Sequence, residues 1–279
     1  MINEDIGREF IIYWNPKMLT RHSKVSEFIH TTLTGMGKRE LGLLPQLKES
    51  KQPDLVHDFR VEIRRLRSVL GSCSPLVDQD WLVPYRQQLK VVDEMISPLR
   101  NAQVLLNRFR KYPAPLLESN AGFEASLEMT LREREAKFQL DMQSQEFVKW
   151  IESLNIENLQ RVPTLNPENE VHGSLKAFNK EQWKSLSKSA RDSTPDSLHK
   201  VRIKAKKVRY LAGASIPVLG DKMEKHEQDA SQIQQLLGEL QDSRMMIDLV
   251  DSGEICEFEK RESKRLVREW RILAREIFE

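Results

Sequence analysis

Apolar residues recur at three- and four-residue spacing along almost the whole chain, and this helical period constrains the fold more than any other feature. No convincing run of alternation with period two accompanies it. Glycine is also scarce, at 11 of 279 residues, which disfavours a turn-rich β-sandwich or barrel. The sequence therefore predicts an all-α protein, with helical stretches at about residues 23–48, 54–70, 80–96, 99–112, 123–154, 175–189, 195–212, 221–238, 242–250 and 254–278.

Charge and hydropathy exclude several classes of protein. The chain has 44 Lys and Arg against 42 Asp and Glu, a net charge of +2, so any anion site must come from how these charges are distributed. The longest uncharged stretch, Tyr210 to Gly220, is much shorter than the roughly 20 residues of a membrane-spanning helix. Two distant cysteines, Cys73 and Cys256, suggest neither a disulfide framework nor a metal clip. We expect a cytoplasmic protein with no membrane span.

The chain contains an internal repeat on either side of a segment rich in Asn and Pro, residues 155–171. The sequence PDLVH at 53–57 matches PDSLH at 195–199, at an offset of 142 positions. Residues 96–101 resemble residues 237–242 at an offset of 141. The repeat predicts two duplicated halves, about 21–154 and 172–279, joined by a linker at 155–171 and preceded by an N-terminal extension, residues 1–20. At the 142-residue offset, four basic residues correspond in pairs: Arg60 with Arg202, Arg64 with Lys206, Arg65 with Lys207, and Arg67 with Arg209.

On a helix, the repeated motif forms a row of positive charge beside an apolar stripe. His57, Arg60, Arg64 and Arg67 fall within an arc of about 80° at 100° per residue, and the apolar stripe adjoins them. In the second half, His199 and the three cations Arg202, Lys206 and Arg209 repeat this geometry. Arg65 and Lys207 point to another flank and are weaker candidates. The stripe of the first half consists of Phe59, Ile63, Leu66 and Leu70.

These two rows indicate a site for an anion with many phosphates. Residues 199–212 contain six Lys or Arg and no Asp or Glu, whereas most solvated helix faces mix the two signs. Like charges on one face repel, so a bound anion would stabilise the row. Each His follows a Pro-Asp start signal, which places it near a helix N-terminus that favours anions. Arginine also matches phosphate oxygens in a bidentate way.

At these positions the chain resembles a known family, the conserved histidine α-helical domain or CHAD. The resemblance rests on HDFRV and RRLR at 57–61 and 64–67, LHKVRI and KKVRY at 198–203 and 206–210, and an LGxLxD pattern at 237–242. It spans about residues 20–279. It implies two four-helix-bundle halves related by pseudo-two-fold symmetry around a basic central cavity. It also implies binding of inorganic polyphosphate and association with polyphosphate granules, without catalysis, cofactor or metal.

Carried over by position, the resemblance implies a specific set of polyphosphate contacts. The first half departs from the family pattern, because Ile96-Ser97 and Asn101 stand where Leu-Gly and Asp are expected. This departure affects the expected helix junction more than the basic row. The implied contacts are His57, Arg60, Arg64, Arg67, His199, Arg202, Lys206 and Arg209.

One alternative is an enzyme, a metal-dependent phosphohydrolase of the all-α His-Asp type. His30, the pair His57-Asp58, and Asp93 occur in the order such a site needs. Against it, His57 and Asp58 point about 100° apart on a helix. Three arginines also share the face of His57, and their charge would oppose binding of a divalent ion.

Two further alternatives involve macromolecular partners. A phosphate-binding row could serve a nucleic acid, but the rows contain no aromatic residues of the kind that single-strand binders use for base stacking. The basic faces could instead meet at an oligomer interface of a purely helical scaffold. The sequence thus favours polyphosphate binding and makes nucleic acid an unfavoured partner.

Overall fold

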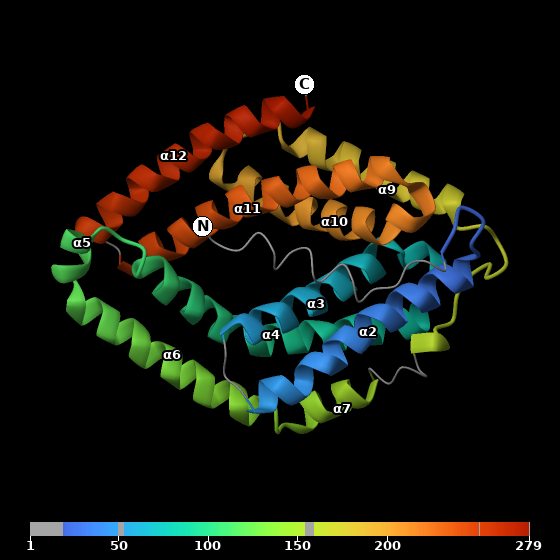
Figure 1. Ribbon diagram of the computed structural model, residues 1–279, viewed down its shortest axis with the longest axis horizontal. Coiled ribbons are helices and arrows are strands. Elements are labelled where there is room, and N and C mark those ends of the chain that lie inside the picture. Colours follow the sequence, from blue (N-terminus) through green and yellow to red (C-terminus); the bar gives the residue numbers. More distant parts are fainter. Residues whose placement is uncertain (1–18, 50–52, 154–158, 251, 279) are drawn as a thin grey trace.

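The protein is almost entirely helical in a computed structural model that describes residues 19–49, 53–153, 159–250 and 252–278 (Figure 1). This confirms the all-α prediction. Residues 1–18, most of the predicted N-terminal extension, and residues 155–158, the start of the predicted linker, lie outside the described residues. The helices are α2 (Val25–Glu49), α3 (Pro53–Ser72), the short 3-10 helix η2 (Ser74–Leu76), α4 (Gln79–Phe109), α5 (Ala114–Glu118), α6 (Ala121–Asp141), α7 (Gln145–Ser153), α9 (His172–Ser189), α10 (Pro195–Leu219), α11 (Asp221–Val250) and α12 (Gly253–Phe278).

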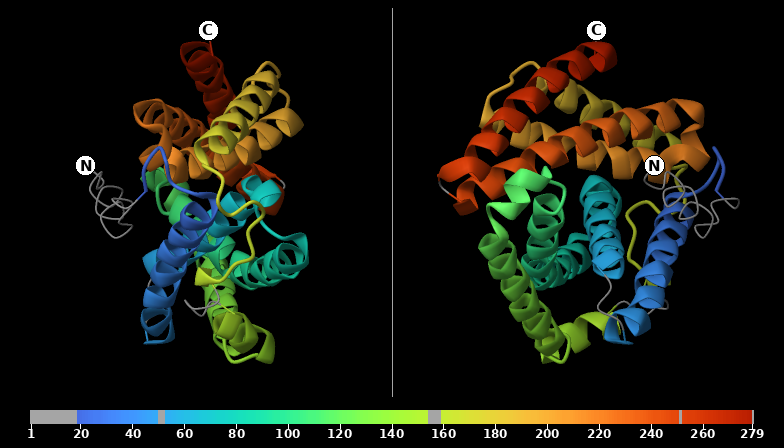
Figure 2. Two further views of the ribbon diagram at one scale, coloured as in Figure 1. Left: turned by 90° about the vertical axis from the view of Figure 1, so that its right-hand side faces the viewer. Right: turned by 60° about the vertical axis from the view of Figure 1, so that its left-hand side comes forward.

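The helices form two groups that meet along α3 and α10. In the first group α3 packs between α2 and α4, and α6 runs along α4. In the second group α10 packs against both α9 and α11, while α12 lies along α11. Figure 2 shows the second group lying across one end of the first. Because α3 also packs directly on α10, the two helices that carry the repeated motif are neighbours. None of the described helices is long and apolar enough to cross a membrane.

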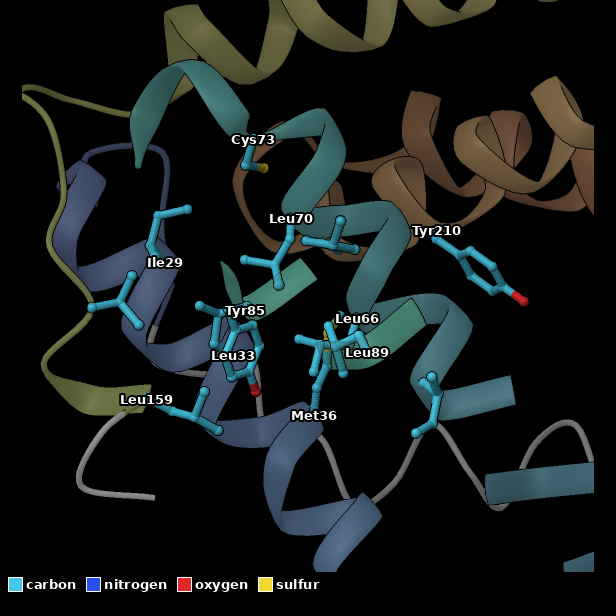
Figure 3. Close-up of a cluster of buried hydrophobic side chains, with 14 of the residues drawn as sticks. Ile29, Leu33, Met36, Leu66, Leu70, Cys73, Tyr85, Leu89, Leu159 and Tyr210 are labelled. Atoms are coloured by element: carbon cyan, nitrogen blue, oxygen red, sulfur yellow. The ribbon is translucent and has the colours of Figure 1, made fainter. Parts of the chain in front are cut away.

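The buried core crosses the predicted boundary between the halves. All four residues of the predicted α3 stripe are buried, as expected for its core-facing side. The cluster around them includes side chains of α2 and α4, and also Tyr210 and Leu211 of α10 (Figure 3). Leu159, Val162 and Val171 of the connecting segment are buried in the same cluster. A second cluster lies within α9–α12. The two groups of helices therefore share apolar contacts. The internal duplication and its pseudo-symmetry remain a prediction.

Both motif helices begin with proline, whose missing N–H costs nothing at the first helical position. Thr194 caps α10 by accepting a hydrogen bond from the Ser197 N–H at 3.4 Å. From these starts, His57 and His199 are each the fifth helical residue. The free N–H donors of a helix belong to its first four residues, so the histidines lie just beyond the anion-favouring end. Their contribution comes from the side chains.

Several predicted helices merge. The predicted helices at 80–96 and 99–112 are one helix, α4, which continues through Pro98 and ends at Phe109. The Ser97 hydroxyl donates to the carbonyl of Asp93 at 2.6 Å next to this proline. Likewise, α11 runs through Gly238, where a break was expected. One glycine costs only about 1 kcal/mol, and α11 is held by α10 and α12 along its length.

The prediction of one helix over residues 123–154 was wrong, because the chain turns between α6 and α7. Ser144 provides the cause. Its hydroxyl accepts a hydrogen bond from the Phe147 N–H at 3.2 Å, which caps the start of α7. The turn lets Phe147 and Trp150 pack into the core beside Phe59.

Candidate anion-binding site

The basic row of α3 converges on one carboxylate of α4, that of Asp93. Arg64 Nε lies 3.3 Å from Asp93 Oδ1, and Arg67 Nη1 lies 2.6 Å from Oδ2. Arg60 Nε is 3.5 Å from Oδ1, while its Nη2 donates to the Ser97 hydroxyl at 3.1 Å. Three guanidinium groups therefore share a single negative charge.

The row of α10 is less neutralised. Among the described residues, neither Arg202 nor Lys206 has a carboxylate oxygen within 4 Å. Arg202 also has a buried Nε with no hydrogen-bond acceptor in the described part of the chain. Arg209, at the far end of the row, has a carboxylate partner, with its Nε 3.0 Å from Glu227 Oε1.

The two rows form one electrostatic unit where α3 meets α10. Loss of hydration, together with the charges of Arg202, Arg64 and Arg60, lowers the pKa of Lys206 to about 6. Loss of hydration and the nearby Arg64, Arg100 and Arg202 lower the pKa of Arg60 to about 10, against the opposing effect of Asp93. Cations from both halves therefore act on one another directly.

Arg100 of α4 belongs to this unit, although the repeated basic motif does not include it. Loss of hydration lowers its pKa, while Asp242 of α11 opposes that shift. Burial raises the pKa of the Asp242 carboxyl, and the positive charges of Arg202, Arg108 and Arg100 only partly oppose this rise. A signal was available, because Arg100 lies in the repeated segment 96–101, opposite Gln241 of the second half. We call the five residues Arg60, Arg64, Arg100, Arg202 and Lys206 the cationic cluster.

The two histidines lie at the edges of the rows, with part of each side chain exposed to solvent and the rest against the protein. Loss of hydration and the charges of Arg100, Arg60 and Arg64 lower the pKa of His57 to about 4, although Asp54 opposes this. His199 Nδ1 lies 3.2 Å from Gln241 Oε1 on α11. His57 is thus neutral near pH 7 in the ligand-free protein and can gain a proton when an anion binds.

The weaker candidates lie apart from the cationic cluster. Arg65 Nη1 pairs with Glu62 of its own helix at 2.9 Å, and its guanidinium lies 5.9 Å from the centre of the Tyr210 ring. Lys207 is exposed. Neither contributes to the charge that the cluster members exert on one another.

The arrangement suits an anion better than a metal ion. Among the described residues, the carboxylates that act on the five cations are Asp93, Asp242, Asp54 and Asp58, and of these Asp93 forms the ion pairs, with Arg60 and Arg64. In the described ranges, no three His, Cys, Asp or Glu side chains come together where they could hold a metal. For the phosphohydrolase alternative, His30 Nε2 instead lies 2.9 Å from the carbonyl oxygen of Val162, and Asp93 is bound by arginines.

Comparisons with known proteins bear on the family and the fold of the chain. A sequence model of the CHAD domain family matches residues 39–251. The uncharacterized protein Rv2226 of Mycobacterium tuberculosis is 25% identical over 206 residues, which cover 68% of this chain and 38% of that protein. The chain thus matches well under half the length of this relative.

Solved structures show the same fold. The crystal structure of the CHAD domain from the plant Ricinus communis aligns with a TM-score of 0.69 at 17% identity, covering 91% of this chain and 89% of that one. PptA from Streptomyces chartreusis aligns with a TM-score of 0.71 at 15% identity, covering 92% and 99% respectively. At these identities the structural likeness supports the fold alone.

Proposed function

Because the chain belongs to the CHAD domain family, we propose that it binds inorganic polyphosphate in the cationic cluster and acts by binding, without catalysis. The observation that carries this proposal is the junction of α3 and α10, where cations of both rows lower one another's pKa. Such a cluster is destabilising when empty and is neutralised by a polyanion. A cytoplasmic location and association with polyphosphate granules belong to the same proposal.

Polyphosphate fits the cluster by charge and by donor geometry. Each internal phosphate carries about one negative charge, and successive phosphates can meet successive cations. The buried Nε atoms of Arg60 and Arg202 have no hydrogen-bond acceptor in the described part of the chain, so phosphate oxygens would satisfy them. Arginine forks also bind phosphate more specifically than a lysine does.

Nucleic acid fits less well. Single-strand binders stack bases on aromatic side chains, and none of the five cluster residues is aromatic. Tyr210 is the aromatic residue next to the α10 row, but it is buried in the core beside Arg65 and Arg209. An unbranched chain of phosphates requires no stacking surface.

Calorimetric titration with long-chain polyphosphate, orthophosphate and single-stranded RNA tests the proposal. Concentrations should be matched in phosphate, and titrations repeated at several salt concentrations. We expect polyphosphate to bind far more tightly than orthophosphate or RNA. If all five cluster cations contact phosphates, the slope of log K against log salt should be about −3.5, at about −0.7 per contact. RNA binding of equal affinity would favour the nucleic-acid alternative, and no binding of polyphosphate would refute the proposal.

A further inference from the structure

The two basic rows differ in one respect that the repeat does not suggest: in the described structure one carboxylate holds three cations of the first row, whereas in the second row a carboxylate holds Arg209 alone. Asp93 binds Arg64 and Arg67 at 3.3 and 2.6 Å and lies 3.5 Å from Arg60. At the 141-residue offset, the second half has the neutral Gln234 at this position. Its buried Oε1 has no hydrogen-bond donor among the described residues.

We propose that Asp93 is an internal competitor of the ligand, which closes the first row to small phosphates and makes the second row the place where a phosphate chain binds first. This inference rests on the proposed function. It assigns to Asp93 a role in specificity, by occupying the same guanidinium groups that a phosphate would use.

The contacts of Asp93 explain why displacing it is difficult for a small anion. Its hydrogen bonds to Arg64 and Arg67 are charge-assisted, a strong class of hydrogen bond. Asp93 is also fixed on α4, and the neighbouring Ser97 ties Arg60 to the backbone carbonyl of Asp93. An incoming phosphate must replace these contacts to gain its own, so its net gain at the first row is small.

A long chain escapes this limit. Arg202 and Lys206 have no carboxylate within 4 Å in the described structure, so a chain can bind there without displacing an acid. The next phosphates of the same chain then face the first row at an effective concentration of about millimolar or more. That concentration can displace Asp93, whereas free short phosphates below it cannot. The first row therefore discriminates tethered from free phosphate.

The test isolates the first row by neutralising the second. In the variant Arg202→Gln with Lys206→Gln, we expect tripolyphosphate to bind at least about tenfold more weakly than to the parent, because the first row remains closed. Adding Asp93→Asn should restore the lost affinity by about tenfold, because it frees Arg60, Arg64 and Arg67. The matched control is Glu94→Gln on the same helix, which changes the net charge equally but releases only the exposed Lys90. It should restore nothing.

Failure of Asp93→Asn to restore binding in the neutralised background would overturn the inference, and so would equal restoration by Glu94→Gln. Asp93→Ser is a second variant, with far-ultraviolet circular dichroism to verify the fold of each. Asp93→Asn in the otherwise unaltered chain separates two roles for this residue. If Asp93 competes with the ligand, the variant binds long-chain polyphosphate more tightly than the parent. If Asp93 instead positions the arginines for the ligand, the variant binds it more weakly. If the parent binds no polyphosphate at all, the proposed function itself fails, a result distinct from these.

Discussion

Lys206 holds its proton weakly in the ligand-free protein, and this makes binding depend on pH. Its pKa of about 6 reflects lost hydration and the charges of Arg202, Arg64 and Arg60, partly offset by Asp93. A bound polyanion stabilises the ammonium form and raises the pKa, so binding takes up a proton. Affinity for long-chain polyphosphate should be highest below about pH 6 and decline as pH rises toward the bound-state pKa. Titrations between pH 5 and 9 measure this.

The matched variant is Lys206→Arg, which keeps the charge over this whole range. It should flatten the decline that begins near pH 6. His57, with a pKa of about 4, adds a decline that begins at lower pH, so His57→Gln should leave the Lys206 step in place. Equal pH profiles for the parent and Lys206→Arg would show that Lys206 is not the titrating group.

The same lysine should weaken the ligand-free fold. Its folded pKa lies below the value of about 10.4 in the unfolded chain, so the unfolded chain binds more protons between about pH 6 and 10. Stability of the parent should therefore rise with pH across that window. At pH 7, Lys206→Gln should increase the free energy of unfolding by about 1–3 kcal/mol, measured by urea titration without ligand.

The control is Lys207→Gln, at the exposed neighbouring residue, which should change the free energy of unfolding by less than about 0.5 kcal/mol. No gain for Lys206→Gln would contradict the argument.

At the residue scale, the sequence could predict which faces of two helices carry positive charge, but not which groups neutralise them. The repeat identified Arg60, Arg64 and their counterparts because both copies share them. It passed over Arg100, because the second half has Gln241 there. From the sequence, Asp93 was a candidate only as a metal ligand, since its distance from the arginines depends on how α4 packs against α3.

At the scale of elements, a buried carboxylate on α12 fastens α4 to the second group of helices. Glu259 is fully buried and accepts two hydrogen bonds from Arg108, at 2.5 and 2.6 Å. The hydroxyls of Tyr112 and of Ser243 on α11 also donate to it. Glu259→Gln would leave Arg108 largely buried without its counter-charge. We expect a loss of about 3 kcal/mol in the free energy of unfolding.

Glu257→Gln on the same helix is the control for this loss. Glu257 forms an exposed pair with Lys260 at 3.0 Å, and such pairs contribute about 0–1 kcal/mol. Thermal and urea unfolding of the two variants should therefore separate clearly. Equal effects would mean that Glu259 does not fasten the helices.

Apolar spacing predicted where helices occur along the chain, but it did not predict where they begin and end. Pro98 and Gly238 are local signals for a break, yet α4 and α11 pass through them because neighbouring helices hold both sides. Conversely, the apolar spacing of residues 123–154 continues across Ser144, where a single capping hydrogen bond starts a new helix. Tertiary packing decides the first case and local hydrogen bonding the second.

At the scale of the whole molecule, the sequence predicted two similar motif helices without predicting that they touch. That contact follows from the shared core, in which Tyr210 and Leu211 of α10 join the cluster around Leu66 and Leu70 of α3. Apolar burial between distant segments thus brings two like-charged rows together against their repulsion. The repulsion is offset in part by Asp93 and Asp242, and a bound polyanion would offset the rest.

This arrangement predicts that both rows bind one ligand. Reversing charge in the first row, with Arg60→Glu and Arg64→Glu, should weaken long-chain polyphosphate binding severely, and Arg202→Glu with Lys206→Glu should do so comparably. Each reversal places carboxylates next to the opposite row, since the mutual lowering of pKa values shows that the two rows lie close together.

The control is Arg132→Glu with Arg134→Glu on the exposed face of α6, which applies the same change in net charge far from the junction. Calorimetry at several salt concentrations gives affinity, stoichiometry and salt slope together. Two independent sites would instead lose half the stoichiometry in each row variant, while the remaining site kept its affinity and salt slope. A single shared ligand requires that affinity and slope fall together in both.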